Sequence, residues 1–137
     1  MAGSTIIPCL RYGDAKQMIV WLCDTFGFER HAVHEDGSGG IAHAQLTLGS
    51  GMIMLGSARD GDDPFGRVQS IPGKLGGTTQ SPYVVVPDAD VIHRRAVAAG
   101  AEIVIAIKDE DYGCRGFSCR DPEGHLWNFG TYDPWQT

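Results

Sequence analysis

Apolar and polar residues follow two different periods along the first half of the chain. Between Asp14 and Gly27 the apolar residues recur at helical spacing, and Gln17 completes a capping box with Asp14, so we expect a helix there. The flanking segments are short, extended and bounded by turn residues, which is typical of strands. We expect these strands at residues 5–12, 28–35, 41–48 and 52–56. The first half is therefore predicted to run β-α-β-β-β.

The second half repeats this order. A helix is expected from Asp88 to Gly100. The strands are expected at residues 83–86, 102–107, 117–120 and 125–129, with a tight turn at Asp121-Pro-Glu-Gly124 before the last one. Gly27 precedes Gly51 by 24 residues, and Gly100 precedes Gly124 by the same number. The equal spacing indicates a duplicated βαβββ unit.

Such a duplication predicts the fold class. We expect an α+β protein in which two tandem βαβββ modules form a curled mixed sheet around a cleft, with the helices on the outer face. The prediction is a single domain over residues 1–137, made of module one (4–57), a linker (58–80) and module two (81–133). The linker is rich in Gly, Asp and Pro and has little periodicity, so it is expected to be a connector or a long mobile loop.

Composition and charge restrict the classes of partner. The net charge is −6 and no run of Lys or Arg is present, so nucleic acid is not an expected partner. No apolar stretch approaches the roughly 18 residues of a membrane helix, and the first residues do not resemble a secretory signal. The cysteines form no CxxC pair, and we expect all four to be buried, reduced thiols in a cytoplasmic protein: Cys9, Cys23, Cys114 and Cys119.

Several motifs in this frame resemble one known family. They are Leu10-Arg-Tyr-Gly-Asp14, His43-Ala-Gln-Leu-Thr-Leu-Gly49, Met52-Ile-Met-Leu55, Asp121-Pro-Glu-Gly124 and Trp127-Asn-Phe-Gly-Thr-Tyr132. Together they resemble the vicinal oxygen chelate superfamily, which includes glyoxalase I, extradiol dioxygenases, fosfomycin-resistance enzymes and bleomycin-binding proteins, and in particular its PhnB-like, glyoxalase-like branch. The resemblance covers nearly the whole chain outside residues 57–80.

The resemblance implies four metal-ligand positions, filled in the family's enzymes by His or Gln, Glu, His and Glu. In this chain they fall on Ile7, Met54 (or Leu55 with a register slip of one), Pro82 and Asn128. Aliphatic side chains, a thioether and proline do not suit Zn²⁺, Ni²⁺ or Fe²⁺, which prefer imidazole or carboxylate, and a lone Asn amide is a poor ligand. We therefore expect the scaffold without a metal and without any other cofactor.

Strand alternation and the family geometry predict what lines the cleft. The expected residues are Ile7, Cys9, Arg11, His43, Gln45, Met54, Tyr112, Arg115, Leu126 and Asn128. Arg11 matches the position at which glyoxalase I enzymes carry an arginine that meets the substrate's carboxylate; a surface salt bridge, for instance to Asp14, is an equal alternative. Trp127 and Phe129 are expected to pack under the second helix, and His93 on that helix is expected to be solvated.

These expectations favour a metal-independent small-molecule-binding protein, similar to the bleomycin-binding members, that sequesters an antibiotic or a metabolite as a homodimer. One alternative is a metal-independent isomerase or lyase with His43 as the catalytic general base. A divergent metal-dependent glyoxalase-like enzyme and a purely structural interaction module are further alternatives.

Overall fold

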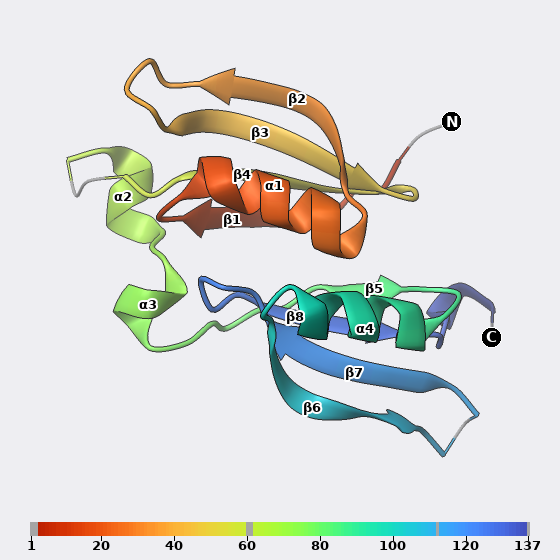
Figure 1. Cartoon of the computed structure of the whole chain (residues 1–137). Coiled ribbons are helices and arrows are strands. Elements are labelled where there is room, and N and C mark those ends of the chain that lie inside the picture. The colour runs from red at the N-terminus through yellow and green to blue at the C-terminus, as the bar shows by residue number, and fades with distance from the viewer. Residues whose placement is uncertain (1–2, 60–61, 112, 137) are drawn as a thin grey trace. The chain divides into compact units, whose positions relative to one another are not determined.

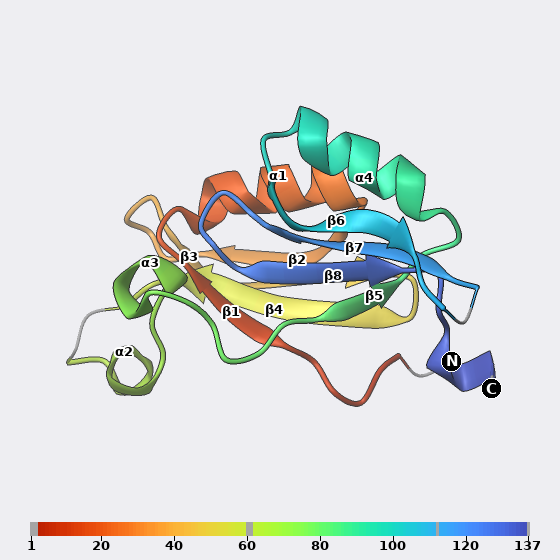
Figure 2. The ribbon, with the colours of Figure 1, turned by 90° about the horizontal axis from the view of Figure 1, so that it is seen from below.

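The computed structural model describes residues 3–59, 62–111 and 113–136. The chain divides into two compact units, Met1–Leu75 and Gly76–Thr137. Each unit contains one four-stranded sheet with a helix against one of its faces (Figures 1 and 2). The predicted α+β class and the tandem βαβββ order are confirmed, but the strands form two four-stranded sheets rather than one curled sheet.

The first unit contains sheet A, with strand order β1-β4-β3-β2. Its elements are β1 (Cys9–Tyr12), α1 (Ala15–Phe26), β2 (Glu29–Glu35), β3 (Ile41–Leu48) and β4 (Gly51–Ser57). Strand β1 pairs with β4 in parallel, and the other neighbours are antiparallel. The predicted caps of α1 are confirmed, since the Asp14 carboxylate accepts the Gln17 N–H at 3.1 Å and Gly27 has a φ of 85°.

The core of this unit lies between α1 and sheet A. The helix contributes Met18, Ile19, Leu22 and Phe26, and the strands contribute Leu10, Ala44, Leu46, Ile53 and Leu55; all are buried. Because side chains alternate along a strand, the residues between these on β1, β3 and β4 lie on the face that α1 does not cover.

The second unit contains sheet B, with strand order β5-β8-β7-β6. Its elements are β5 (Tyr83–Val85), α4 (Ala89–Ala98), β6 (Glu102–Asp109), β7 (Arg115–Arg120), β8 (Leu126–Gly130) and the 3₁₀ helix η1 (Pro134–Gln136). Trp127 and Phe129 are buried, as predicted. His93 of α4 meets the Phe117 ring edge-on at 5.0 Å, so the prediction of a solvated His93 is wrong: the side chain is half-buried against the sheet.

Asp121 holds the turn that leads into β8. The residue is 4% exposed, and its carboxylate accepts the N–H groups of Glu123 and His125 at 3.0 and 3.1 Å. It also accepts the indole Nε1–H of Trp127 at 3.1 Å. The carboxylate therefore closes the turn and fixes the Trp127 ring on the helix-covered face of sheet B.

The pairing of the first strand with the last strand repeats in the two units with an offset of 74 positions. The Met54 N–H donates to the Pro8 carbonyl at 2.9 Å, and the Asn128 N–H donates to the Pro82 carbonyl at 3.0 Å. The acceptor moves from position 8 to 82 and the donor from position 54 to 128, which is the same shift in residue number. The position that corresponds to Ile7 is therefore Ser81, which corrects the earlier assignment of the third metal-ligand position to Pro82.

The segment predicted as a connector or a long mobile loop contains two short helices, α2 (Pro64–Val68) and α3 (Pro72–Leu75). Asp63 caps α2 by accepting the Phe65 N–H at 2.8 Å, and Pro64 takes the first helical position, where its missing N–H costs nothing. The sequence did not predict these two helices. Within the described ranges, every helix is too short or too polar to cross a membrane.

Candidate functional site

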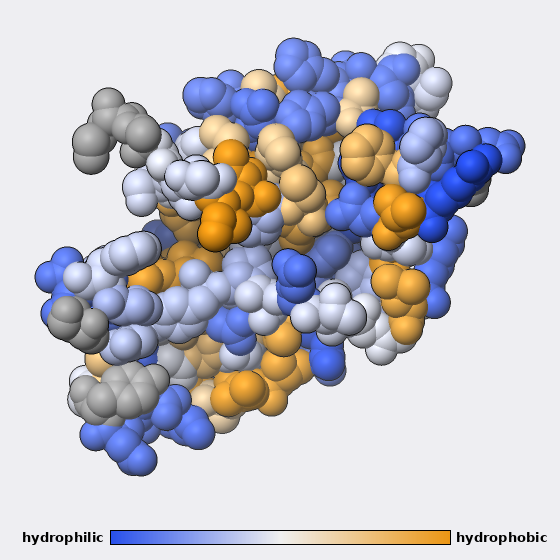
Figure 3. Space-filling view, turned by 180° about the vertical axis from the view of Figure 1, so that it is seen from behind, coloured by the Kyte–Doolittle hydropathy of each residue, from blue (hydrophilic) through white to orange (hydrophobic). Residues whose placement is uncertain are grey.

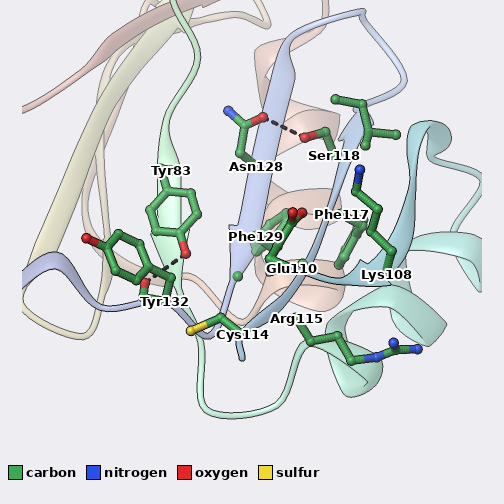
Figure 4. Close-up of a pocket in the computed structure, with 13 residues that line it drawn as sticks. Tyr83, Lys108, Glu110, Cys114, Arg115, Phe117, Ser118, Asn128, Phe129 and Tyr132 are labelled. Atoms are coloured by element: carbon green, nitrogen blue, oxygen red, sulfur yellow. Dashed lines mark hydrogen bonds between the residues drawn. The ribbon is translucent and has the colours of Figure 1, made fainter. Parts of the chain in front are cut away.

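A hollow of about 330 Å³ lies on the face of sheet B that α4 leaves open (Figure 4). Its lining comes from all four strands of the sheet and from the segments that follow β6 and β8. The lining residues are Tyr83, Ile105, Lys108, Glu110, Cys114, Arg115, Gly116, Phe117, Ser118, Asn128, Phe129, Gly130 and Tyr132.

Strand register explains why these residues meet. Tyr83 pairs with Asn128, Asn128 with Ser118, and Ser118 with Ile105, which gives one row across the four strands. In the next row on the same face, Gly130 pairs with Gly116 and Gly116 with Lys108. The two glycines lack side chains, so the middle of the sheet is lower than its two outer strands.

Gly116 has a steric reason to be glycine. A Cβ at this position would lie 2.6 Å from the Phe129 carbonyl oxygen and 3.3 Å from the Gly130 Cα, both of which are backbone atoms that cannot turn aside. The floor of the hollow is therefore open because the backbones of β7 and β8 approach closely there.

Asn128 occupies the end of the hollow and is held by three hydrogen bonds. The Ser118 hydroxyl donates to Asn128 Oδ1 at 2.6 Å (Figure 4). Asn128 Nδ2 donates to Ser81 Oγ at 2.8 Å and to the Pro82 carbonyl at 3.0 Å. Both amide hydrogens and the amide oxygen therefore have partners within the unit, which fixes the orientation of the side chain.

The four positions at which the family's enzymes hold a metal carry Ile7, Met54, Ser81 and Asn128. None of these side chains is an imidazole or a carboxylate, and the Asn128 oxygen already accepts the Ser118 hydroxyl. Divalent zinc, nickel and iron favour the missing ligand types, so the donor set does not fit the family's metal. In the described residues, no three His, Cys, Asp or Glu side chains are grouped closely enough to hold an ion.

Arg115 lines the hollow, but its charge is already paired. Its Nε donates to Asp90 at 3.1 Å and its Nη1 to Asp109 at 3.2 Å. Hydrogen bonds to Asp90 and then to Asp109 raise the pKa of Arg115 above its usual value. In Figure 4 the guanidinium points away from Ser118 and Asn128. Of the other predicted residues, Leu126 is not among the lining residues, and Tyr112 lies outside the described residues.

The other predicted site residues lie in the first unit. Cys9 pairs with Met54 and Met54 with Gln45, in one row on the face of sheet A that α1 leaves open. Arg11 and His43 lie on the same face, while Ile7 precedes β1 and is half-buried. The structure thus brings Cys9, Gln45 and Met54 together, as strand alternation predicts.

Arg11 is engaged by the segment that was predicted as a linker. Its Nε donates to Gln69 Oε1 at 3.2 Å, and its guanidinium lies 5.4 Å from the centre of the Phe65 ring. Arg59 contacts the same ring at 5.6 Å. Burial, and then the nearby Arg59 charge, lower the pKa of Arg11. Sequence reasoning missed these partners because residues 58–80 carry no periodic pattern.

His43 lies beside two residues with which it forms a small polar group. Gln45 Nε2 is 3.1 Å from His43 Nε2, and the His34 ring lies parallel to the His43 ring at 6.3 Å. The contact between the Gln45 amide and the ring nitrogen orients the His43 imidazole on the open face of sheet A. Sequence reasoning missed His34, although the pairing of β2 with β3 places it directly opposite His43.

The cysteines differ from one another more than predicted. Cys119 is fully buried, and burial followed by the Asp121 charge raises its pKa to about 12. Cys9 is exposed, and Cys23 and Cys114 are half-buried. The prediction of four buried thiols is therefore wrong for Cys9, because the outer strand β1 leaves its helix-free face uncovered.

The sequence matches one family model and several curated proteins. The model of the Glyoxalase/Bleomycin resistance protein/Dioxygenase superfamily matches residues 5–129. The uncharacterized protein Mb0911c of Mycobacterium bovis is 35% identical over 92 residues, which are 67% of this chain and 59% of that protein. The uncharacterized protein Rv0887c of Mycobacterium tuberculosis is also 35% identical, over 67% of this chain and 53% of its own length. The match thus spans little more than half the length of these relatives.

Solved structures match over more of the chain. TioX from Micromonospora sp. ML1 is 34% identical with a TM-score of 0.72, over 93% of this chain and 98% of that one. The fosfomycin resistance protein FosX from Mesorhizobium loti has a TM-score of 0.66 over 99% of this chain and 98% of its own, at 12% identity. That low identity shows a shared fold alone.

Proposed function

Since the chain belongs to the Glyoxalase/Bleomycin resistance protein/Dioxygenase superfamily, we propose that it binds a small organic molecule without a metal, in the hollow on sheet B. The observation that carries this proposal is the hydrogen bonding of the Asn128 amide. At the position where the family's enzymes hold their ion with a carboxylate, this chain has an amide whose polar atoms are all bonded within the protein.

The size and lining of the hollow support a small ligand. Its volume of about 330 Å³ lies at the lower end of the range of about 300–1,000 Å³ typical of small-molecule sites. The lining combines exposed apolar groups with a few fixed polar ones, which is the usual composition of such sites. Sequestration of an antibiotic or a metabolite is the role that we propose for this binding.

The experiment is a ligand screen on chelator-treated protein. A thermal-shift screen of metabolites and antibiotics identifies ligands, and calorimetry then gives their Kd before and after EDTA treatment. Ile105→Trp fills the hollow from its rim and should weaken binding by at least tenfold. Val97→Trp is the matched control, because Val97 is equally exposed on α4 and should leave the Kd unchanged (53% and 52% exposed). Loss of binding with EDTA, or equal Kd values in both variants, contradicts the proposal.

A second candidate function is catalysis by His43 as general base, in an isomerase or lyase. The contact with Gln45 supports it, because a hydrogen bond to one ring nitrogen orients the imidazole, as a positioned base requires. Every ligand from the screen should therefore be tested for turnover. Loss of product formation in His43→Ala, with binding retained, would favour the enzyme; a ligand recovered unchanged from the native protein would exclude it for that ligand.

We also propose that the protein acts as a homodimer in the cytoplasm. Large apolar side chains remain exposed, and Figure 3 shows orange apolar groups among blue polar ones over one face of the molecule. The most exposed are Ile6, Val68, Leu75 and Trp135. Exposed apolar area of this kind is often covered by a partner. Light scattering after gel filtration tests the proposal, and a monomeric mass at micromolar concentration contradicts it.

A further inference from the structure

We infer that the ligand of the sheet B hollow is a zwitterion built on a flat ring, with its acidic group bound by Lys108 and its basic group bound by Glu110. This inference rests on the proposed function and names the chemical class of the ligand. It follows from which charged side chains of the lining are paired within the protein and from where its apolar side chains are exposed.

Three charged side chains line the hollow, and only one of them is paired with another described residue. Arg115 is bound by Asp90 and Asp109. Lys108 and Glu110 make no side-chain hydrogen bond or ion pair with any described residue, and they do not pair with each other. In Figure 4 the Lys108 ammonium points toward the end of the hollow at which Ser118 lies. One cation and one anion are thus left to a ligand.

Strand alternation places these two charges on the same side. Lys108 pairs with Gly116, so it shares the open face with the glycine floor, whereas Asp109 points the other way and reaches Arg115. Glu110 follows at the end of β6 and is half-buried. Because opposite charges at two neighbouring points attract opposite groups, a ligand with both signs uses both side chains, and a ligand with one sign meets one attraction and one repulsion.

The apolar part of the lining suits a ring. Tyr83 and Ile105 lie at opposite ends of one register row and are 45% and 52% exposed. The Tyr83 hydroxyl donates to the Tyr132 carbonyl at 2.8 Å, which fixes its ring in advance. A flat ring above Gly116, beside the Tyr83 ring that covers Gly130, would contact both side chains, and its burial supplies most of the binding free energy.

The polar side chains of Asn128 and Ser118, in the same register row, are not available to bind the charged groups of a ligand. Asn128 has all its polar atoms bonded, and the Ser118 hydroxyl hydrogen is donated to it. Specificity for charge is therefore left to Lys108 and Glu110.

The test uses four indole probes that share a ring and differ in charge: tryptophan, indole-3-propionate, tryptamine and 3-methylindole. Calorimetry or fluorescence gives the Kd of each with the native protein. An exposed ion pair contributes about a threefold change in affinity, so tryptophan should bind about tenfold more tightly than 3-methylindole. Higher salt should reduce this difference.

Two variants separate the contributions. Lys108→Met should weaken tryptophan and indole-3-propionate by about threefold and leave tryptamine no weaker, whereas Glu110→Gln should weaken tryptophan and tryptamine. Lys74→Met and Glu29→Gln make the same charge changes at exposed positions outside the hollow and should change no Kd. Both lining residues are on or beside the outer strand β6, so neither change removes a packed core group.

Each other result overturns the inference. Equal affinity for the four probes, preference for a singly charged probe, or identical effects of the lining and control variants would show that the hollow does not select a zwitterion. No binding of any probe would exclude the indole-sized zwitterion. The proposed function is tested separately, by the ligand screen and Ile105→Trp, and would stand if a ligand of another class bound there.

Discussion

The phenol ring of Tyr83 lies across the α-carbon of Gly130. A Cβ on Gly130 would come within 3.1 Å of two ring carbons of Tyr83 and closer still to its hydroxyl oxygen. The absence of a side chain on β8 therefore allows the ring from β5 to lie flat and to donate its hydroxyl to Tyr132. The same device recurs on sheet A, where a Cβ on Gly56 would collide with the Arg11 guanidinium.

This relationship predicts the effect of Gly130→Ala. The added methyl group forces the Tyr83 ring from its place, and overpacking of this kind costs about 1–3 kcal/mol of unfolding free energy. Urea unfolding measures the cost. In a Tyr83→Ala background the same change should cost less than half as much, because the colliding ring is gone. Equal costs in the two backgrounds would show that the Tyr83 ring is not the reason why position 130 requires glycine.

Asp121 is expected to be among the most sensitive polar residues of the second unit. Its carboxylate accepts two backbone N–H groups and the Trp127 indole N–H inside the protein. Asp121→Ala leaves these buried donors without their acceptor, so it should lower the unfolding free energy by about 3 kcal/mol. Chemical denaturation followed by Trp fluorescence measures this loss.

Asp133→Ala is the control for that experiment. Asp133 accepts the Trp135 N–H at 2.9 Å in a short, exposed 3₁₀ helix. Its removal should cost no more than about 1 kcal/mol, as for a single cap. Similar losses in both variants would contradict the role given to the Asp121 carboxylate.

The thiols should react in an order set by burial. Cys9 is exposed and should react first with Ellman's reagent, whereas Cys119, with a pKa of about 12 and no exposed surface, should react only on unfolding. Burial also raises the pKa of Cys23, which should therefore be slow. Absorbance at about pH 8 follows the reaction. Cys9→Ser should remove the fast phase, and its persistence would contradict the assignment.

The segment around α2 should depend on the two arginines at Phe65. Phe65→Leu keeps an apolar side chain but removes the ring that Arg11 and Arg59 contact, and each exposed cation–π contact contributes about 0.5–1 kcal/mol. Amide exchange at Arg67 and Gln69, whose N–H groups close α2, should therefore accelerate severalfold.

Amide exchange in α4 provides the internal reference for this experiment. Exchange at Ala99, which closes α4, should not change in Phe65→Leu. Val68→Ala alters a side chain of the same helix that is 82% exposed, and it should leave both helices unchanged. Equal acceleration in the two variants would mean that the cation–π contacts do not hold the segment.

Much of the fold could be predicted from local sequence. Asp14 and Gly27 mark the ends of α1 through a side-chain acceptor and a left-handed residue, and both effects act within a few positions of the chain. The alternation of β8 likewise predicts that Trp127 is buried and that Asn128 faces the other way. The exception was the segment from 58 to 80, whose helices are too short to show a period.

The candidate site was only partly predictable. Met54, Asn128 and Gln45 were placed on the open faces of their sheets by alternation, and the structure agrees. Alternation did not reveal that Arg115 is paired with Asp90, 25 positions away along the chain. The partners of Arg11 were missed for the same reason, since Gln69 lies 58 positions from it.

The sequence by itself determined the secondary structure, its duplication and the side chains at the family's ligand positions, because these depend on residue identity and on neighbours a few positions apart. The tertiary structure alone decided which charges are paired within the protein. Arg115 and Lys108 carry the same charge and lie on neighbouring strands, yet within the described part of the chain only Arg115 meets carboxylates. Whether a charge is paired depends on groups that folding brings together from distant positions in the chain. A local sequence pattern does not show which distant residues become neighbours.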